Sequence, residues 1–402
     1  MSADEPATSS SAAIPAMAIP VLSLAAFGSA LSLRVTDPLL PRLAQEFGVS
    51  IGEAAYVITA FAIAYGFSQL FFGPVGDRFG KYFVIACACV GCAFTALLCA
   101  LALNYPLLIA ARLMAGATAA AIIPLSMAWI GDVVPYSERQ PVLAQFLIGQ
   151  IVGISAGVLL GGLAADHLGW RLPFFCISAY FVAVSLMLFS FNRRLPDYAR
   201  VTHKAEGSAL RRMVNEFGQV LSKPWARVVL LTVFMEGGFL YGAFAFIALH
   251  LHRVHHMTLT HAATLVMLFG LGGFLYAVTA RKLVKKLGEK KLALWGGILV
   301  TASLLTISLA PQWWWAIIGC SVCGLGFYMM HNTLQMNATQ MAPERRGAAV
   351  SAFASCFYLG QSFGVGAAGM AAERFGTSIV IAIGAVGVLL TAITFSYLKT
   401  ES

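Results

Sequence analysis

The feature that most constrains this chain is a series of apolar runs, each about 20 residues long, that recurs along nearly its whole length. A helix of about 20 apolar residues can cross the hydrocarbon core of a bilayer. Hydrophobic residues make up 59% of the chain and charged residues 11%, whereas a soluble domain is about 45–50% apolar and about 25% charged. The sequence therefore predicts an all-α membrane protein with twelve transmembrane helices. The predicted spans are residues 15–38, 51–73, 82–103, 107–130, 142–165, 172–192, 227–251, 262–280, 292–310, 313–336, 347–370 and 377–397.

The formal net charge of +9 is distributed unevenly over the predicted loops. If the N-terminus is cytoplasmic, the outer loops hold only Arg42, Arg171, Arg253 and Arg374 of the 26 Lys and Arg residues, and nearly all the others lie in inner loops and tails. Such an excess of Lys and Arg in cytoplasmic loops is the usual orientation signal of membrane proteins. We therefore expect both termini in the cytoplasm and a lipid bilayer, not a nucleic acid, around the protein.

A polar and basic segment at residues 193–226 interrupts the apolar runs. It predicts a division into a cytoplasmic tail at 1–14, a six-helix half at 15–192, this linker, and a second six-helix half at 227–402. Apolar residues inside the linker follow helical spacing, which predicts a short helix on the inner membrane surface.

The two halves resemble each other at an offset of 207 residues. Gly153, Gly157, Gly162 and Asp166 match Gly360, Gly364, Gly369 and Glu373. Parallel repeats of this kind are typical of transporters whose substrate site lies where the halves meet. Chance similarity between Gly-rich helices is the alternative, which several matches near half the chain length disfavour.

The stretch FFGPVGDRFGKYFV at residues 71–84 places three charges between two apolar spans. It fits the pattern G-x-x-x-D-R-x-G-[RK] through Gly73, Asp77, Arg78, Gly80 and Lys81. Together with the twelve spans, the basic linker and the repeat, this motif resembles the major facilitator superfamily. The resemblance implies two pseudo-symmetric six-helix bundles, and a charge network in which Asp77 lies against the N-terminus of span 11 and holds the cytoplasmic side closed. The alternative is a solvated inner loop, which would not require Asp77 or the glycines.

Arg112 is the one charged residue of span 4, and together with Gly116 it is similar to a span 4 signature of the family that is associated with proton coupling. A charge within a span is costly and is by default a functional hypothesis. The alternative is an arginine whose long side chain reaches the outer membrane surface.

Span 5 carries a series of glycines, Gly153, Gly157, Gly161 and Gly162, that resembles the family's antiporter signature, with Val158 in place of its proline. The resemblance favours export. Close helix packing, which small residues allow in either case, is the alternative.

Two acids lie within predicted spans, and proton coupling is expected at such positions. Asp37 stands one turn after Arg34 in span 1 and resembles the acid before a proline in bacterial drug:proton antiporters; Glu236 is the one acid of span 7. Because burial makes ionisation costly, either carboxyl group could exchange a proton. The alternative for Asp37 is a fixed ion pair with Arg34.

Polar and aromatic residues of spans 7 and 10 are candidates for a substrate cavity. His331 and Gln335 share a helix face and Asn332 lies beside them, while Tyr241 and Phe244 could line an apolar pocket. Hydrogen bonds between helices and ordinary aromatic packing are the alternatives. Five histidines follow in the outer segment HLHRVHHMTLTH, but spacing alone does not predict a metal site.

The sequence thus predicts a proton-coupled secondary transporter of the bacterial inner membrane, working as a monomer by alternating access and exporting small amphipathic or toxic compounds. The alternatives are proton-coupled transport of a specific metabolite and, from another class, a non-transporting membrane receptor. No phosphate-binding G-x-x-x-x-G-K-[ST] motif, cofactor site or catalytic pattern is recognised, so we expect no cofactor and no enzyme activity.

Overall fold

A computed structural model describes residues 15–200 and 209–399, and the regular elements among them are helices. A helix pairs its backbone N–H and C=O groups within the span, as a bilayer requires. The first half contains α1 (Ala18–Arg34), α2 (Leu40–Phe47), α3 (Ile51–Ala54), α4 (Tyr56–Phe79), α5 (Lys81–Ala100), α6 (Tyr105–Ala119), α7 (Ile122–Val133), α8 (Tyr136–Leu163), the π-helical turn η1 (Ala164–Leu168) and α9 (Leu172–Asn192). After the short turn η2 (Asp197–Arg200) follow α10 (Ala209–Ser222), α11 (Pro224–Phe244), α12 (Ile247–His255), α13 (Leu259–Val266), α14 (Phe269–Leu309), α15 (Trp315–Gln340), η3 (Pro343–Arg345), α16 (Arg346–Phe375) and α17 (Thr377–Leu398).

Twelve spans are present within the described residues. Ten helical stretches are long and apolar enough to cross a membrane, and α1 is a shorter apolar helix. One of the ten, Leu259–Leu309, contains a residue with non-helical backbone angles, Gly288 (φ 67°), which divides it into two spans. The prediction of a twelve-helix, all-α membrane protein is therefore confirmed.

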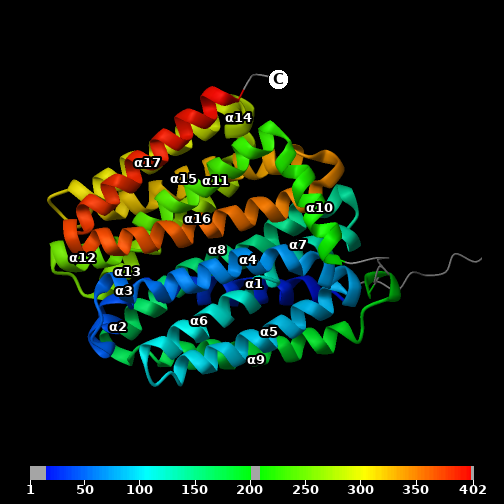
Figure 1. Ribbon diagram of the computed structural model, residues 1–402, viewed down its shortest axis with the longest axis horizontal. Coiled ribbons are helices and arrows are strands. Elements are labelled where there is room, and N and C mark those ends of the chain that lie inside the picture. The colour runs from blue at the N-terminus through cyan, green and yellow to red at the C-terminus, as the bar shows by residue number, and fades with distance from the viewer. Residues whose placement is uncertain (1–14, 201–208, 400–402) are drawn as a thin grey trace, which may run out of the picture.

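Figure 1 shows the helices in two groups that lie side by side. The first group contains α1 to α9 and the second α11 to α17, and they meet mainly where α4 packs against α16 and α8 packs against α13 and α14. The residue limits predicted for the two halves stay a prediction.

Several spans are interrupted near their middle. Span 1 breaks between α1 and α2, where Pro38 lacks the N–H that a continuous helix would use. Span 4 breaks between α6 and α7, and span 7 between α11 and α12. Broken helices at membrane depth are common beside the binding sites of transporters, because their free backbone groups lie next to the cavity.

The central segment carries a helix, α10, where the sequence predicts one. It is attached to the second half, since Arg345 at the start of α16 contacts Gln219 (2.9 Å) and Glu216 (3.5 Å). Lys223 also forms an ion pair with Glu344. Figure 1 shows α10 at the same end of the molecule as the C-terminus, the end that the charge distribution assigns to the cytoplasm.

Candidate functional site

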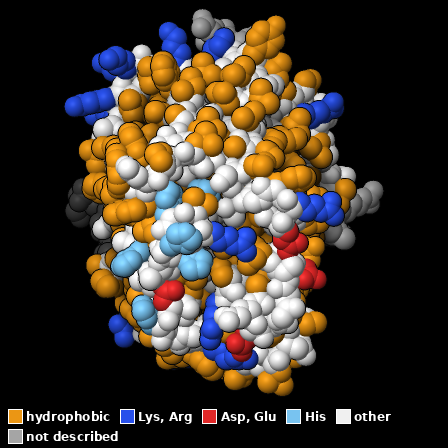
Figure 2. All heavy atoms as spheres, turned by 90° about the vertical axis from the view of Figure 1, so that its left-hand side faces the viewer, with side chains coloured by type: hydrophobic (Ala, Val, Ile, Leu, Met, Phe, Trp, Pro, Cys, Tyr) orange, Lys and Arg blue, Asp and Glu red, His pale blue; other side chains and the backbone are white. Residues whose placement is uncertain are grey.

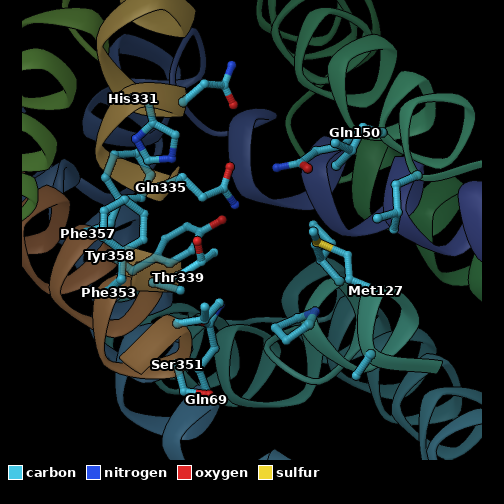
Figure 3. A pocket seen from close by; sticks show the side chains of 18 of the residues that line it. Gln69, Met127, Gln150, His331, Gln335, Thr339, Ser351, Phe353, Phe357 and Tyr358 are labelled. Carbon is cyan, nitrogen blue, oxygen red and sulfur yellow. The ribbon is translucent and has the colours of Figure 1, made fainter. Parts of the chain in front are cut away.

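A cavity of about 2210 Å³ lies between the two halves. Its walls come from α7 and α8 on one side and α15 and α16 on the other, as Figure 3 shows for Met127 and Gln150 opposite His331 and Gln335. The lining extends from Arg346 at the cytoplasmic start of α16 to Arg34 at the end of α1. At the other end the halves are in contact, so the cavity opens at the end that the loop charge assigns to the cytoplasm.

The inner part of the cavity is strongly aromatic. Four of the predicted cavity residues line it: Tyr241, His331, Asn332 and Gln335. Phe244 instead packs against Tyr241 and Phe269, whose ring centres are 5.7 and 4.9 Å away. Residues that the sequence analysis missed also line the cavity: Tyr65, Gln69, Gln150, Phe327, Tyr328, Phe353, Phe357 and Tyr358. Phe353 and Phe357 are four positions apart and therefore share one helix face, a pattern in the sequence that could have predicted them as cavity residues.

His331 connects the cavity to a buried acid. Its Nδ1 lies 2.9 Å from Oε2 of Glu236, which is 1% exposed. Oε1 of Glu236 has no hydrogen-bond partner among the described residues. The imidazole is partly exposed and lies against the ring of Phe357, with centroids 4.5 Å apart. A buried carboxyl group therefore lies one hydrogen bond from a titratable ring that borders the cavity.

Arg34 joins the two halves within the membrane. Its Nη1 lies 3.5 Å from Oδ2 of Asp37, and its Nη2 donates to Oε1 of Gln361 over 3.1 Å. The guanidinium also lies over the ring of Tyr241, 3.8 Å from the centroid. Arg34 and Asp37 thus form the predicted ion pair, and Arg34 additionally contacts α11 and α16 of the second half.

Arg112 is fully buried in the first half, so its side chain does not extend to the surface. It donates to the carbonyl oxygen of Val57 (3.2 Å), to that of Ser32 (3.0 Å) and to the hydroxyl of Thr36 (3.4 Å). Carbonyl groups in the last turn of a helix lack partners within that helix. Arg112 therefore stabilises the broken end of α1 next to Asp37.

The 71–84 stretch lies at the cytoplasmic mouth of the cavity, where Asp77, Arg78 and Lys81 line it. Gly80 has φ 89°, which lets α5 follow α4 directly. Lys81 lies 2.9 Å from Asp77 and 2.7 Å from Asp132 of α7, so the charge network lies within the first half. Asp132 was not among the residues predicted from the sequence. Asp77 does not reach the start of α16 in the described structure, because the cavity separates the halves at this end.

The other two motif residues are also at the mouth. Arg78 lies over the ring of Phe79 and lines the cavity. A Cβ atom placed on Gly73 would meet no atom within 4 Å in the part of the chain that the structure describes. The close approach of span 2 to span 11 that the motif implies is made deeper in the membrane, where Gly66 packs against Leu359.

The span 5 glycines face two different partners. Gly153, Gly157 and Gly161 pack against the backbone of span 1, and a Cβ on Gly161 would lie 2.2 Å from the carbonyl oxygen of Val35. Gly162 instead faces α13 of the second half, where a Cβ would lie 2.4 Å from that of Ala263. The series therefore serves both packing within the first half and contact between the halves.

The cavity has an excess of positive groups. The acids among its described lining residues are each paired with a base: Asp77 with Lys81, Glu216 with Arg345, and Glu289 with Lys399. Arg78 and Arg346 line it as well, whereas Arg34 is paired with the buried Asp37. A negatively charged molecule is therefore favoured inside it over a positive one.

The histidine-rich segment lies at the outer end, where Figure 2 shows histidine side chains gathered on one part of the surface. His250 is buried, with its ring nitrogens 3.0 Å from Thr377 and 3.1 Å from the carbonyl oxygen of Ile307. Among the described residues, no three His, Cys, Asp or Glu side chains are grouped as a metal site requires.

Two groups of broken helices around a cavity that is open at one end and closed at the other define a membrane transporter. The Major Facilitator Superfamily model matches residues 22–365, and the chain belongs to this superfamily. It is accordingly a secondary transporter and not an enzyme, which also sets aside the receptor alternative.

Relatives and solved structures agree with this family. The chain is 26% identical over 337 residues to the Bacillus subtilis MFS-type transporter YceJ (83% of each chain) and 25% identical over 374 residues to the Escherichia coli inner membrane transport protein YdhP (91% and 92%). It is 30% identical to the Escherichia coli multidrug export protein EmrB over 166 residues, 41% of this chain and 32% of EmrB. The fold is similar to those of the nucleoside transporter NupG (TM-score 0.77, 15% identity, 95% and 99% covered) and a bacterial homologue of Spinster, solved facing inward (TM-score 0.73, 19% identity, 95% and 96%).

Proposed function

We propose that this protein is a proton-coupled exporter of small amphipathic compounds in the bacterial inner membrane, and that it works as a monomer. The observation that carries the proposal is the His331–Glu236 pair. It places a buried carboxyl group within one hydrogen bond of an aromatic cavity that faces the cytoplasm. The local similarity to a multidrug export protein and the glycine series of span 5 support the direction of transport.

In this mechanism, His331 is the route by which Glu236 exchanges its proton with the cytoplasm. Loss of the proton leaves a buried charge, whose cost is lowest while the histidine is protonated beside it. The apolar part of a substrate packs on rings such as Phe357, and its polar groups bind the amides of the cavity wall. Binding and proton release in the inward-facing state are thereby linked at neighbouring side chains.

Asp37 and Arg34 transmit protonation to the contact between the halves. While Asp37 is ionised, Arg34 is held between it, Gln361 and Tyr241. When a proton entering from outside neutralises Asp37, Arg34 loses its ionic partner and its contacts with the second half change in strength. A change in charge at one residue thus shifts the balance between the two states of the transporter.

Transport by the purified protein in liposomes tests the proposal. With a pH gradient imposed, substrate added to liposomes that contain the protein is expected to move in one direction while protons move in the other. Substrate that moves together with protons would contradict antiport. Asp37→Asn and Glu236→Gln are each expected to abolish coupling. Glu46→Gln is the matched control: the hydrogen bond from Arg171 holds the pKa of the Glu46 carboxyl below its ordinary value, and both residues lie outside the spans.

Proton-coupled transport of a specific polar metabolite is the second candidate. The observation that favours it is the set of side-chain amides around the cavity, Gln69, Gln150, Asn332 and Gln335. Fixed amides select a ligand with matching hydrogen-bonding groups. A screen in which a pump-deficient host is protected against many unrelated toxic compounds would favour the multidrug function, and protection against none would favour the metabolite.

A further inference from the structure

Two carboxylates at the outer end of the molecule connect the halves. Asp166 lies in η1, after α8, and its Oδ2 accepts a hydrogen bond from the backbone N–H of Thr260 over 2.6 Å. Its Oδ1 lies 3.3 Å from the backbone nitrogen of Leu259. These two residues begin α13, and the first N–H groups of a helix have no partner within it. The acid belongs to the first half and the helix to the second.

The second carboxylate makes the same connection in the opposite direction. Glu373 lies near the end of α16 in the second half, and its Oε1 accepts from the backbone N–H of Gly52 over 2.7 Å. Gly52 lies in α3, the first turn of span 2, in the first half. The side chain of Ser50 accepts from the N–H of Glu53 in the same turn.

The two contacts are related by the internal repeat. The acids are 207 positions apart, at 166 and 373, and the donors 208 apart, at 52 and 260. The residues before each first turn, Ser50 and Thr258, are also 208 apart, and each accepts a hydrogen bond from a backbone N–H three residues later. The internal repeat therefore encodes the same type of contact once in each half.

Close backbone packing accompanies each contact. Gly162 and Gly369 stand four positions before the two acids. A Cβ on Gly162 would lie 2.8 Å from the carbonyl oxygen of Leu259, and one on Gly369 would lie 3.1 Å from Cα of Gly52. Each acid is thus held beside its donors by a glycine that lies in close contact with the opposite half.

We infer that Asp166 and Glu373 are a pair of outer latches that hold the external side of the transporter closed. Each hydrogen bond joins an ionised acceptor to backbone donors, a stronger kind than a bond between neutral groups. Donor and acceptor belong to different halves, so separating the halves at the outer end breaks both latches together. The latches therefore favour the inward-facing state. This inference rests on the contact geometry and is independent of the substrate and of proton coupling.

Distances between spin labels on the outer surface test the inference without any substrate. One label replaces Leu103, which is 85% exposed in the first half, and the other replaces exposed Gln312 in the second half. A second pair at Leu103 and Gln45 lies within the first half and is the internal control. The accessible cysteines Cys87, Cys176 and Cys356 are replaced by serine, and the protein is studied in lipid nanodiscs.

The expected result is a shift toward longer Leu103–Gln312 distances when the latches are removed. Asp166→Ala and Glu373→Ala should each raise the ratio of outward-open to outward-closed molecules by a similar factor, and the double variant should raise it about tenfold. Asp166→Asn and Glu373→Gln keep the size and one acceptor oxygen, so their shift should be smaller. The distances of the control pair should stay unchanged.

Glu46→Gln is the matched control variant, because Glu46 is an outer acid whose partner, Arg171, lies in the same half. A wild-type distance distribution in the double alanine variant would overturn the inference. An equal shift in Glu46→Gln would overturn it as well. If the alanine variants do not yield folded protein, the amide variants decide between the same two results, with a melting curve of each to show that it is folded.

Discussion

His331 and Glu236 stand 95 positions apart in the sequence, yet Nδ1 of the histidine lies 2.9 Å from Oε2 of the glutamate. The pair connects α15 with α11 at the wall of the cavity, and Oε1 of the glutamate has no hydrogen-bond partner in the described part of the chain. A proton can pass directly between two side chains that are joined by one hydrogen bond.

We expect His331→Gln to reduce proton-driven transport about tenfold, because glutamine can hydrogen-bond to Glu236 but cannot carry a proton. Substrate binding without a gradient should change much less. The assay is transport into liposomes with and without a pH gradient, compared with binding to the detergent-purified protein. His261→Gln, an exposed histidine of α13, is the control. Equal losses of binding and transport would assign His331 to the substrate alone.

The buried Arg34–Asp37 pair predicts a non-additive effect on stability. Arg34→Gln leaves the Asp37 carboxylate without its ionic partner and should destabilise the protein by about 3 kcal/mol. Removing both charges in Arg34→Gln/Asp37→Asn should recover part of that loss, because no unpaired charge then stays buried. Melting temperatures in detergent measure both effects. A double variant no more stable than Arg34→Gln would show that the pair is not the source of the loss.

The glycines of spans 2 and 5 should respond differently to alanine. Gly161→Ala places a methyl group 2.2 Å from the carbonyl oxygen of Val35 and should lower stability by about 1–3 kcal/mol. Gly73→Ala meets no atom within 4 Å in the described structure and should leave stability unchanged. Transport by Gly73→Ala should nevertheless fall if span 2 approaches span 11 when the cytoplasmic side closes. Normal transport by this variant would contradict that closure contact.

The charge network at the cytoplasmic mouth predicts an asymmetric latch. Asp77→Asn removes the ion pair with Lys81 and the acid that the family resemblance assigns to closure, so we expect weaker cytoplasmic closure and slower transport. Lys285, at the matching position of the second half, is exposed and its change to glutamine should have little effect. Labelling of a cysteine at Gln335, in the cavity, from the cytoplasmic side measures closure. Equal effects of the two substitutions would make the 71–84 stretch an ordinary loop.

Arg78 and Arg346 in the cavity lining predict a preference for negatively charged substrates. In a pair of amphipathic dyes of matched size, we expect the anion to bind more tightly than the cation and the difference to shrink at high salt. Fluorescence anisotropy with the purified protein measures both affinities. Tighter binding of the cation would show that the lining charges do not control selection.

The sequence by itself determined the number of spans, the internal repeat and the positions of the buried acids, and its loop charge predicts the orientation of the spans. Span length and loop charge are properties of local sequence, because a bilayer imposes the same length and polarity on every helix that crosses it. The motif at 71–84 likewise placed the cytoplasmic mouth. The starts of the helices were predicted only approximately: α11, for example, begins at Pro224, where proline fits the first helical turn, rather than at residue 227.

Only the tertiary structure decided which side chains meet. Arg34 and Gln361, 327 positions apart, form one hydrogen bond, and Phe244 turns away from the cavity that Tyr241 lines. The structure also decided that Gly162 serves the contact between halves and that the cavity faces the cytoplasm. These features depend on how two six-helix groups dock and on which of their alternative arrangements is occupied, and the residues involved carry no local pattern that identifies their partners.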